Sequence, residues 1–363
     1  MSFSVTPLVS ASIDTRALRH NLGLVRARAP KSRIMAVIKA NGYGHGLITV
    51  ARALDAADAF AVARVDEGLT LRDAGIAQPI VLLEGVFDQE QLAAAAAARF
   101  ELVVHTLEQI DLLRGCNATH RFKVWLKIDT GMNRLGFKGT QVPAAHAALN
   151  ALRVVQSPIN LFTHLSSADV PGAAVTEEQL NVFAAAVRGL PGERCIESSA
   201  AIFAFPEHQA DWVRPGLLLY GVSPFAGSTG ADYGLEPVMT LHSHIIAVKA
   251  LEVGERVGYG GHWIASRPTQ LAIAAIGYGD GYPRSLPSGS PVLVNGERAA
   301  LAGRVSMDMI GIDVTDLKVE ARLGDPVLLW GAGLPVEEIA LWAQTIPYEL
   351  LCGISQRVAV KIV

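Results

Sequence analysis

A regular alternation of short apolar runs and helical segments fills the chain from Ile34 to about Arg214. Each run has the length and apolar content of a buried strand, and the segments between the runs place apolar residues at helical spacing. Asp14, Thr106 and Thr176 stand where side chains cap helices. The predicted strands cover residues 34–39, 60–65, 80–84, 102–105, 123–129, 159–165, 195–199 and 212–214. About eight strand–helix units in succession predict a closed parallel (β/α)8 barrel of the TIM type, although an open doubly wound sheet would have the same periodicity.

The pattern changes after residues 233–237. Strands separated by Gly, Pro and Asp follow, with one helix over about 336–344. These predicted strands cover residues 238–248, 270–276, 291–294, 305–314, 326–330 and 357–363. We therefore predict an α/β chain with two domains, a barrel over residues 1–234 and a mostly β C-terminal domain over residues 235–363.

Composition limits the partners that this chain can have. It has 363 residues, half of them hydrophobic, which is enough for a large core. A formal net charge of -3 favours neither nucleic-acid binding nor attachment to an anionic membrane. The first residues lack the character of a signal peptide and no apolar run is long enough to span a membrane, so we expect a cytoplasmic protein. Three cysteines far apart in the sequence predict neither a disulfide framework nor a metal site.

Lys39 ends the first predicted barrel strand, at a position where an apolar residue would belong. A buried ammonium loses its proton readily and becomes an amine nucleophile. Glycines at 42, 44 and 46 let the backbone approach a ligand, and Tyr43 among them offers a hydroxyl to an anionic oxygen. A lysine that extends along the surface from a strand end is the alternative interpretation. Other strand ends also carry polar residues, which places function at the carboxyl face of the barrel: Glu84, Asp129, His164, Ser199 and Arg214.

The segment Ala36-Val-Ile-Lys39-Ala-Asn-Gly-Tyr43-Gly-His-Gly46 resembles the pyridoxal phosphate lysine signature of alanine racemases. Seven further segments extend the resemblance over nearly the whole chain. They are Lys127-Ile-Asp-Thr-Gly-Met-Asn-Arg134, Thr163-His164-Leu, Ser198-Ser199-Ala-Ala, Val213-Arg214-Pro-Gly216, Val257-Gly-Tyr259-Gly, Gly303-Arg-Val-Ser-Met307-Asp308 and Pro347-Tyr348-Glu. Ser198 stands where many members have asparagine, and Gly42 replaces a common alanine.

The resemblance implies a pyridoxal 5'-phosphate enzyme and a role for each matching residue. Residues that would bind the cofactor are Lys39, Tyr43, Arg134, His164, Ser199, Arg214, Gly216, Leu217 and Tyr348, and those at the substrate carboxylate are Arg134, Met307 and Asp308. Pro215 suits the first turn of a short helix, so the N–H groups of Gly216 and Leu217 would face the phosphate. The loops after strands seven and eight are the usual phosphate site of such barrels.

The resemblance also implies a two-base mechanism that interconverts L- and D-alanine. Lys39 would exchange a proton on one face of the substrate and Tyr259 on the other. Arg214 keeps its own proton, so the cofactor nitrogen that it faces would stay unprotonated, which favours reprotonation at Cα over transamination. A cationic cluster of His164 and Arg214 would help Tyr259 to ionise. The enzyme would supply or degrade D-alanine for the peptidoglycan of the cell wall.

A head-to-tail homodimer is a further implication of the resemblance, with Tyr259, Met307 and Asp308 of one subunit completing the site of the other. Lys127 aligns with a lysine that is carbamylated in some members, and the sequence leaves its modification open. Taken singly, Tyr259 is an ordinary turn aromatic and His164 an ordinary core histidine. The order of all these residues along the chain is what favours the functional interpretation.

Three other functions remain as alternatives. A decarboxylase of the same architecture typically places a glutamate opposite the ring nitrogen, where this chain has Arg214. A non-enzymatic cofactor-carrying barrel shares the lysine loop but ends with the barrel. A racemase for serine or a broader set of amino acids would differ in its pocket, where one hydroxymethyl group is worth only about 1–3 kcal/mol.

Overall fold

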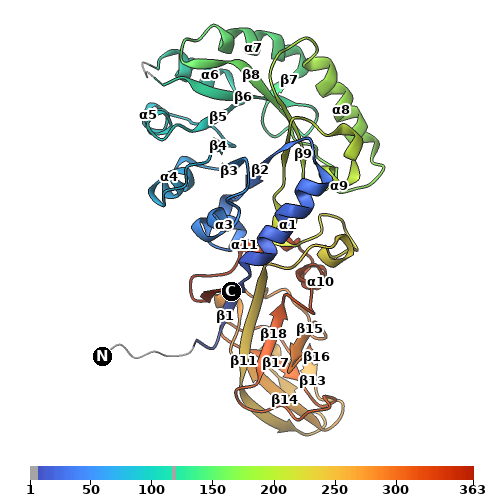
Figure 1. The fold of residues 1–363 in the computed structure, drawn as a ribbon. Helices are drawn as coiled ribbons and strands as arrows, with labels where there is room; N and C mark the ends of the chain where they lie inside the picture. The colour runs from blue at the N-terminus through green and yellow to red at the C-terminus, as the bar shows by residue number, and fades with distance from the viewer. Residues whose placement is uncertain (1–6, 117–119) are drawn as a thin grey trace, which may run out of the picture. The chain divides into compact units, whose positions relative to one another are not determined.

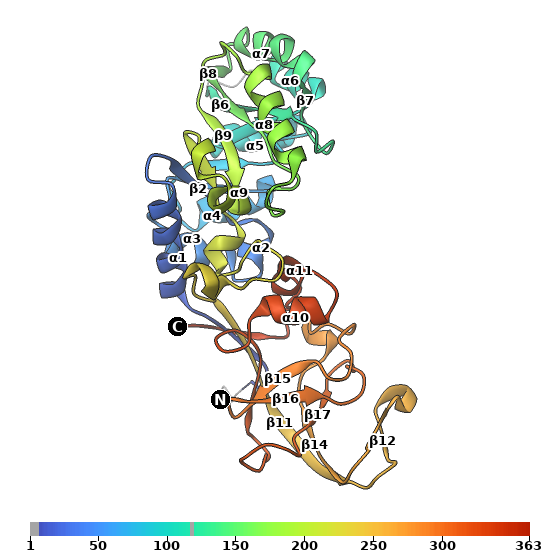
Figure 2. The same cartoon turned by 90° about the vertical axis from the view of Figure 1, so that its right-hand side faces the viewer.

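The computed structural model describes residues 7–116 and 120–363. Contacts divide the chain into two compact units, whose ribbons can be followed in Figure 1 and Figure 2. The barrel unit consists of Arg19–Leu219 and Pro224–Gly227. The β unit consists of the described residues up to Leu18, together with Tyr220–Ser223 and Ser228–Val363. The predicted boundary between residues 234 and 235 stays a prediction.

Eight parallel strands form a closed barrel in the barrel unit. They are β2 (Arg33–Val37), β3 (Ala59–Val62), β4 (Ile80–Leu82), β5 (Glu101–Val104), β6 (Phe122–Asp129), β8 (Val155–Phe162), β9 (Arg194–Ser198) and β10 (Trp212–Arg214). Their order is β5-β4-β3-β2-β10-β9-β8-β6, and β5 pairs with β6 to close the ring. The closing pair leaves no open edge, which confirms the predicted barrel and excludes the open sheet. A short strand, β7 (Phe137–Lys138), continues beside the end of β6.

Helices alternate with the barrel strands along the chain, and the first of them, α1, precedes β2 (Figure 1). They are α1 (Thr15–Arg28), α2 (Lys39–Tyr43), α3 (Leu47–Ala53), α4 (Val65–Asp73), α5 (Gln89–Ala97), α6 (Leu107–Arg114), α7 (Val142–Asn150), α8 (Ala174–Ala186) and α9 (Ser199–Ala204). Two predicted caps are confirmed: Asp14 Oδ1 accepts from the N–H of Arg16 at 2.8 Å, and Thr106 Oγ1 accepts from the N–H of Gln109 at 3.4 Å. Within the described ranges, no helix is both long and apolar enough to cross a membrane.

The predicted cap at Thr176 is wrong. Helix α8 begins two residues earlier, so Thr176 lies inside it and is fully buried. Gln179, the expected partner in that cap, instead donates from Nε2 to Thr130 Oγ1 at 3.0 Å and accepts from the N–H of Ser166 at 2.9 Å. A polar side chain that can reach a second loop is better satisfied there than at its own helix start, and this contact ties α8 to the loop after β6.

The core of the barrel is aromatic and aliphatic. Trp125 is fully buried and meets Phe162 and Trp212 edge to face, with ring centroids 6.4 and 5.8 Å apart. Burial of such rings contributes several kcal/mol each and fixes the strand ends that carry polar residues.

The β unit contains a second sheet of eight strands. They are β1 (Ser10–Ile13), β11 (Met239–Leu251), β14 (Thr269–Ala274), β15 (Pro291–Val294), β16 (Glu297–Leu301), β17 (Ile310–Asp313), β18 (Pro326–Trp330) and β19 (Ala359–Ile362). A separate hairpin joins β12 (Arg256–Val257) to β13 (Trp263–Ile264), and two helices, α10 (Val336–Trp342) and α11 (Pro347–Cys352), complete the unit. The predicted β domain is confirmed, and α10 is its predicted helix. The second helix, α11, was not predicted.

Strand β1 was not among the predicted strands. It is four residues long and pairs antiparallel with β11 and parallel with β19. Its sequence, Ser-Ala-Ser-Ile, has too little alternation to be recognised before its partners are known. The N-terminal strand thereby belongs to the sheet formed by the C-terminal part of the chain.

Candidate active site

Lys39 begins α2 at the carboxyl end of β2, and this short element is a left-handed turn and not a regular helix. The strand ends at Val37, two residues before the predicted end, and the next four residues after Lys39 have positive φ angles of 53, 54, 62 and 52°. A left-handed conformation costs roughly 1–2 kcal/mol for each residue other than glycine. Two hydrogen bonds offset this strain: Glu67 Oε1 accepts from the N–H of Ala40 at 2.6 Å, and Asn41 Oδ1 accepts from the N–H of Leu47 at 2.9 Å. Such strain at a strand end is typical of functional loops.

The amine of Lys39 is partly removed from water. Burial lowers its pKa, and the positive charges of Arg134 and Arg214 lower it further. A lower pKa increases the share of neutral amine at physiological pH, which is the form that attacks a carbonyl. The structure therefore gives Lys39 the environment that its position in the sequence predicted.

Arg214, the last residue of β10, organises the polar centre of the barrel. It is buried, and its guanidinium donates from Nη1 to Cys195 Sγ at 3.0 Å and from Nη2 to the carbonyl of Thr163 at 3.1 Å. Its Nη2 also lies 3.0 Å from Nδ1 of His164, and its Cζ lies 4.2 Å from the ring centroid of Phe162. These contacts hold the guanidinium plane in one orientation.

His164 is neutral in this arrangement. A guanidinium only donates hydrogen bonds, so the Nδ1 atom that faces Arg214 must accept and cannot carry a proton. Burial, together with the charges of Arg214 and Lys127, lowers the pKa of His164 to about 2. The expectation that His164 contributes a cation is therefore wrong, because a second positive charge beside Arg214 would be desolvated and repelled.

Arg134 lies in the loop between β6 and β7. Asp129 shapes this loop: its Oδ1 accepts from the N–H groups of Gly131 and Asn133 at 3.1 and 2.9 Å, and its Oδ2 pairs with Lys138 Nζ at 2.7 Å. The loop brings Arg134 to a small cavity that Lys127 and His164 also line.

Lys127 is buried on β6, with its Nζ 5.0 Å from the ring centroid of Phe162. Burial, and next the charge of Arg214, lower its pKa to about 7. A large share of Lys127 is then the neutral amine at physiological pH, which is the form that carbamylation requires.

Ser199, Gly216 and Tyr43 meet at the loops after β9 and β10. Ser199 Oγ accepts from the N–H of Gly216 at 2.9 Å and from that of Leu218 at 3.4 Å. A Cβ atom at Gly216 would lie 2.6 Å from the hydroxyl oxygen of Tyr43. Leu217 begins a short 3-10 helix, Leu217–Tyr220, directly after this contact. The structure thus brings together four of the residues predicted to bind a phosphate.

The remaining predicted site residues lie in the β unit. Tyr259 begins a 3-10 turn after the β12 strand and exposes 72% of its surface. Val257, two residues earlier, packs with Leu271 and Ala302 in a small core cluster, which anchors the hairpin that presents Tyr259. The tyrosine is therefore held on a supported turn while its ring stays in solvent.

Met307 and Asp308 lie in an irregular loop before β17, which begins only at Ile310 instead of at residue 305 as predicted. The carbonyl of Met307 accepts from the N–H of Gly279 at 2.9 Å. Arg357 Nη2 donates to Asp308 Oδ1 at 2.8 Å, and Arg357 Nε lies 3.4 Å from Asp280 Oδ1. Tyr348 lies on α11 in the same unit.

Two residues that support the site escaped the sequence analysis. Glu67 is the third residue of α4, and its position at a helix start could have identified it as a capping residue. The bond that its Oε1 accepts from the N–H of Ala40 in the Lys39 turn could not have been predicted, because it joins two separate segments. Arg357 is 49 residues from Asp308, so no local pattern links them.

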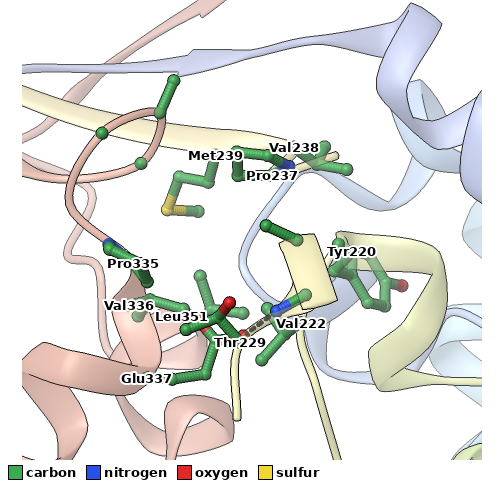
Figure 3. A pocket seen from close by; sticks show the side chains of 16 residues that line it. Tyr220, Val222, Thr229, Pro237, Val238, Met239, Pro335, Val336, Glu337 and Leu351 are labelled. Atoms are coloured by element: carbon green, nitrogen blue, oxygen red, sulfur yellow. Dashed lines mark hydrogen bonds between the residues drawn. The ribbon is translucent and has the colours of Figure 1, made fainter. Parts of the chain in front are cut away.

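A pocket of about 130 Å³ in the β unit contains none of the predicted site residues (Figure 3). Its walls are mostly apolar, and Glu337 is the one charged residue among those that line it. Glu337 Oε1 accepts from the N–H groups of Ser223 and Gly230 at 2.9 and 2.8 Å. This carboxylate thereby fastens the chain segment around residues 223–230, which is a structural role.

Glu197 is a buried carboxyl on β9 whose ionisation affects the stability of the fold. It is 1% exposed, its Oε2 accepts from the N–H of Ala210 at 3.3 Å, and its Oε1 has no hydrogen-bond partner among the described residues. Burial raises its pKa from 4.5 to about 7. Because its pKa is raised in the folded state, Glu197 makes its full contribution to the stability of the fold below pH 4.5, where the carboxyl is protonated. This contribution is lost as the pH rises through about 7 and the buried carboxyl ionises.

We therefore expect Glu197→Gln to raise the free energy of unfolding at pH 8 by about 3 kcal/mol and to change it little near pH 4.5. Urea unfolding at both pH values measures this difference. Glu178→Gln, on the exposed side of α8, is the control and should show no such pH dependence. Equal stability of Glu197→Gln and the unaltered chain at pH 8 would contradict the prediction.

Comparison with known proteins identifies the family. The model of the alanine racemase N-terminal domain matches residues 13–224, and that of the C-terminal domain matches residues 238–362. An alanine racemase from Shigella dysenteriae and a biosynthetic alanine racemase from Escherichia coli K12 are each 49% identical over 352 residues, covering 97% of this chain and 98% of the relative. The crystal structure of biosynthetic alanine racemase from Pseudomonas aeruginosa superposes with a TM-score of 0.95 at 43% identity, covering 99% of this chain and all of that one. The chain belongs to the alanine racemase family and is an isomerase.

Proposed function

We propose that this protein interconverts L- and D-alanine with pyridoxal 5'-phosphate, using Lys39 and Tyr259 as its two bases. The observation that carries the proposal is the Lys39 turn, which holds a lysine of lowered pKa at the carboxyl face of a parallel barrel. The alanine racemases from Escherichia coli and Pseudomonas aeruginosa that resemble the chain are named biosynthetic, which supports a role in supplying D-alanine.

The residues of the barrel unit fit pyridoxal phosphate. A phosphate needs several hydrogen-bond donors and room close to the backbone. We assign the hydroxyl groups of Ser199 and Tyr43 and the N–H of Leu217 as donors, and Gly216 leaves the room. A methyl group at Gly216 would fill the space beside the Tyr43 hydroxyl, 2.6 Å away. We assign Arg214 to the ring nitrogen and Arg134 to the phenolate oxygen. When bound, the cofactor supplies an aldehyde for amines and a ring that withdraws electrons from the substrate Cα.

The proton transfers belong to the protein. Nζ of Lys39 accepts or returns the α-proton on one face of the substrate, and the hydroxyl oxygen of Tyr259 does so on the opposite face. The guanidinium of Arg214 stays protonated and does not give a proton to the ring nitrogen. The ring therefore withdraws fewer electrons from the substrate Cα, which favours return of the proton to Cα. His164 is a neutral hydrogen-bond acceptor for Arg214 and supports its orientation.

The substrate carboxylate is assigned to Arg134, Met307 and Asp308, and Tyr348 is assigned to the cofactor phosphate. Arg357 holds Asp308 by a hydrogen bond of 2.8 Å and so positions this part of the site. A free carboxylate that binds to a fixed guanidinium is oriented as well as attracted.

A head-to-tail homodimer with shared active sites is part of the proposal. Tyr259 and Met307 are 72% and 51% exposed in the single chain, although both are assigned to the chemistry. Large exposed side chains of this kind suit a site that a second copy completes. A cytoplasmic location stays a prediction from the sequence.

The function is tested by chiral chromatography of enantiopure L-alanine after incubation with the cofactor-loaded protein, with carbon dioxide measured in the same sample. We expect D-alanine to form and no carbon dioxide to be released. Carbon dioxide without D-alanine would favour the decarboxylase, and enantiopure alanine in a protein that binds the cofactor would favour a non-enzymatic carrier. The same assay with L-serine and other amino acids measures the substrate range.

Gly216→Ala tests the phosphate assignment. The added methyl group must displace the Tyr43 hydroxyl, so we expect the affinity for pyridoxal phosphate to fall about tenfold, the equivalent of one lost hydrogen bond. Titration of the apoprotein with the cofactor, followed by absorbance, gives the affinity. Gly23→Ala is the matched control, because a Cβ atom there has no neighbour within 4 Å. An unchanged affinity in Gly216→Ala would remove this loop from the phosphate site.

A further inference from the structure

The barrel unit has a second cavity at the amino ends of its strands, opposite the strand ends that carry the candidate active site. Its volume is about 580 Å³. Glu101, the first residue of β5, and Lys123, the second residue of β6, both line it. Barrels of this kind perform catalysis at their carboxyl face, so this cavity lies outside the catalytic centre.

Positive charge dominates the lining of this cavity. Arg72, Arg99, Arg121 and Lys123 contribute four cations, and Glu101 is the one carboxylate in the lining. Glu101 is already engaged, because its Oε1 lies 3.4 Å from Lys123 Nζ and its Oε2 accepts from the indole N–H of Trp125 at 2.7 Å. Such a concentration of cations contrasts with the formal net charge of -3 for the whole chain.

Among the side chains that the structure describes, the three arginines have no acidic partner. Within residues 7–116 and 120–363, Glu207 aside, no carboxylate lies within 4 Å of the guanidinium nitrogens of Arg72, Arg99 or Arg121. Burial lowers the pKa of Arg72, as expected for a cation that is partly removed from water. Three guanidinium groups that share one concave surface repel one another, and a bound anion would relieve this repulsion.

Backbone carbonyls hold two of these arginines in place. Arg72 donates from Nε to the carbonyl of Ala98 at 3.0 Å and from Nη1 to those of Ile76 and Gln78 at 2.6 and 2.9 Å. Arg121 donates from Nη2 to the carbonyl of Val155 at 2.8 Å. The remaining N–H groups of these two side chains have no acceptor among the residues that the structure describes. An immobilised guanidinium loses less entropy on binding an anion than a mobile one.

Arg99 has a left-handed backbone conformation. It follows Ala98, the C-cap residue of α5, and has a φ of 55°, a conformation that glycine adopts at lower energy. An arginine at this position costs about 1 kcal/mol of backbone strain, and its side chain lines the cavity.

We propose that this cavity, formed around Arg72, Arg99 and Arg121, binds a small molecule that carries two or more phosphate groups. The planar fork of each guanidinium matches phosphate oxygens, and three uncompensated positive charges match the charge of a diphosphate. The volume is that of an ordinary small-molecule site. Binding here is separate from the proposed phosphate site of the cofactor at Ser199 and Gly216.

The test is isothermal titration calorimetry of inorganic pyrophosphate into the cofactor-loaded, dialysed protein at low ionic strength. We expect one binding event per chain that weakens as salt is added. The double variant Arg99→Ala with Arg121→Ala should bind pyrophosphate at least tenfold more weakly, and the corresponding double lysine variant should retain part of the affinity. Arg72 is left unaltered because its carbonyl bonds support the fold.

Arg52→Ala is the matched control, since Arg52 is an exposed arginine on α3 of the same unit, and it should change the affinity less than twofold. Racemase activity and the melting temperature of the double alanine variant should equal those of the unaltered protein. Absence of binding to the unaltered protein would overturn the proposal. Undiminished binding to the folded double alanine variant would also overturn it, because the anion would then occupy another site, such as the phosphate site of the cofactor.

Discussion

Replacement of Lys39 by alanine is expected to abolish covalent attachment of the cofactor and to lower the rate of racemisation by at least about a thousandfold. In the proposed mechanism Lys39 is the nucleophilic amine and one of the two bases, so the substitution would remove both functions. Its side chain is half-buried in a turn whose shape depends on Glu67 and Asn41, and alanine preserves those bonds. We therefore expect the variant to fold normally.

Absorbance spectra of the purified variant measure this loss directly. The visible band of the covalently bound cofactor, which borohydride removes from the unaltered protein, should be missing. Lys31→Ala is the control, because Lys31 is an exposed lysine that precedes the same strand. A Lys39→Ala protein that retains both the band and the activity would refute the assignment on which the proposed function rests.

Tyr259→Phe should produce the second largest effect, a fall in the rate of racemisation of at least about a hundredfold in both directions, with the cofactor still bound. Phenylalanine removes one hydroxyl from a side chain that is 72% exposed, so the stability of the β unit should change little. A single remaining base can remove a proton from one face only. In deuterated water the variant should still exchange the α-proton of one alanine enantiomer, while it converts neither into the other.

Proton NMR of L- and D-alanine, incubated separately with the variant, distinguishes these processes. Tyr278→Phe is the comparison variant, a second exposed tyrosine of the β unit that is assigned no proton transfer. Full racemisation by Tyr259→Phe in both directions would end the two-base mechanism, even if Lys39 proves essential.

The two variants together test whether the active site is shared between subunits. If Lys39 of one copy works with Tyr259 of the other, a mixed dimer contains one intact site and one site that lacks both bases. Equal mixing after dissociation should then restore about a quarter of the full activity, because half of the dimers are mixed and half of their sites are intact. If both bases come from one chain, every site lacks one base and mixing restores nothing.

Much of the barrel could be predicted from the sequence because each buried parallel strand is a short run of neighbouring apolar residues. All eight predicted strands are present, and β10 (Trp212–Arg214) has the predicted ends. The caps at Asp14 and Thr106 were recognised because a capping residue acts within three positions of itself. The cap at Thr176 was misplaced because Gln179 bonds to Thr130, which is 49 positions away along the chain.

The chemistry of the site divides in the same way. The sequence specified which groups are present, from the amine of Lys39 to the guanidinium of Arg214, and the resemblance specified their expected roles. Neither the sequence nor the resemblance specified the charge of His164. That charge depends on burial and on a contact of 3.0 Å with a residue 50 positions away, neither of which has a local pattern.

The amino-acid sequence by itself determined the strand and helix pattern, the polar residues at the strand ends and the family, since each of these is written in neighbouring residues or in their order. Only the tertiary structure decided the closure of the barrel between β5 and β6, the lowered pKa of Lys127, the bond from Arg357 to Asp308 and the grouping of Arg72, Arg99 and Arg121. The physical reason is that desolvation and Coulomb forces depend on distance in space, and folding sets those distances between residues far apart in the chain.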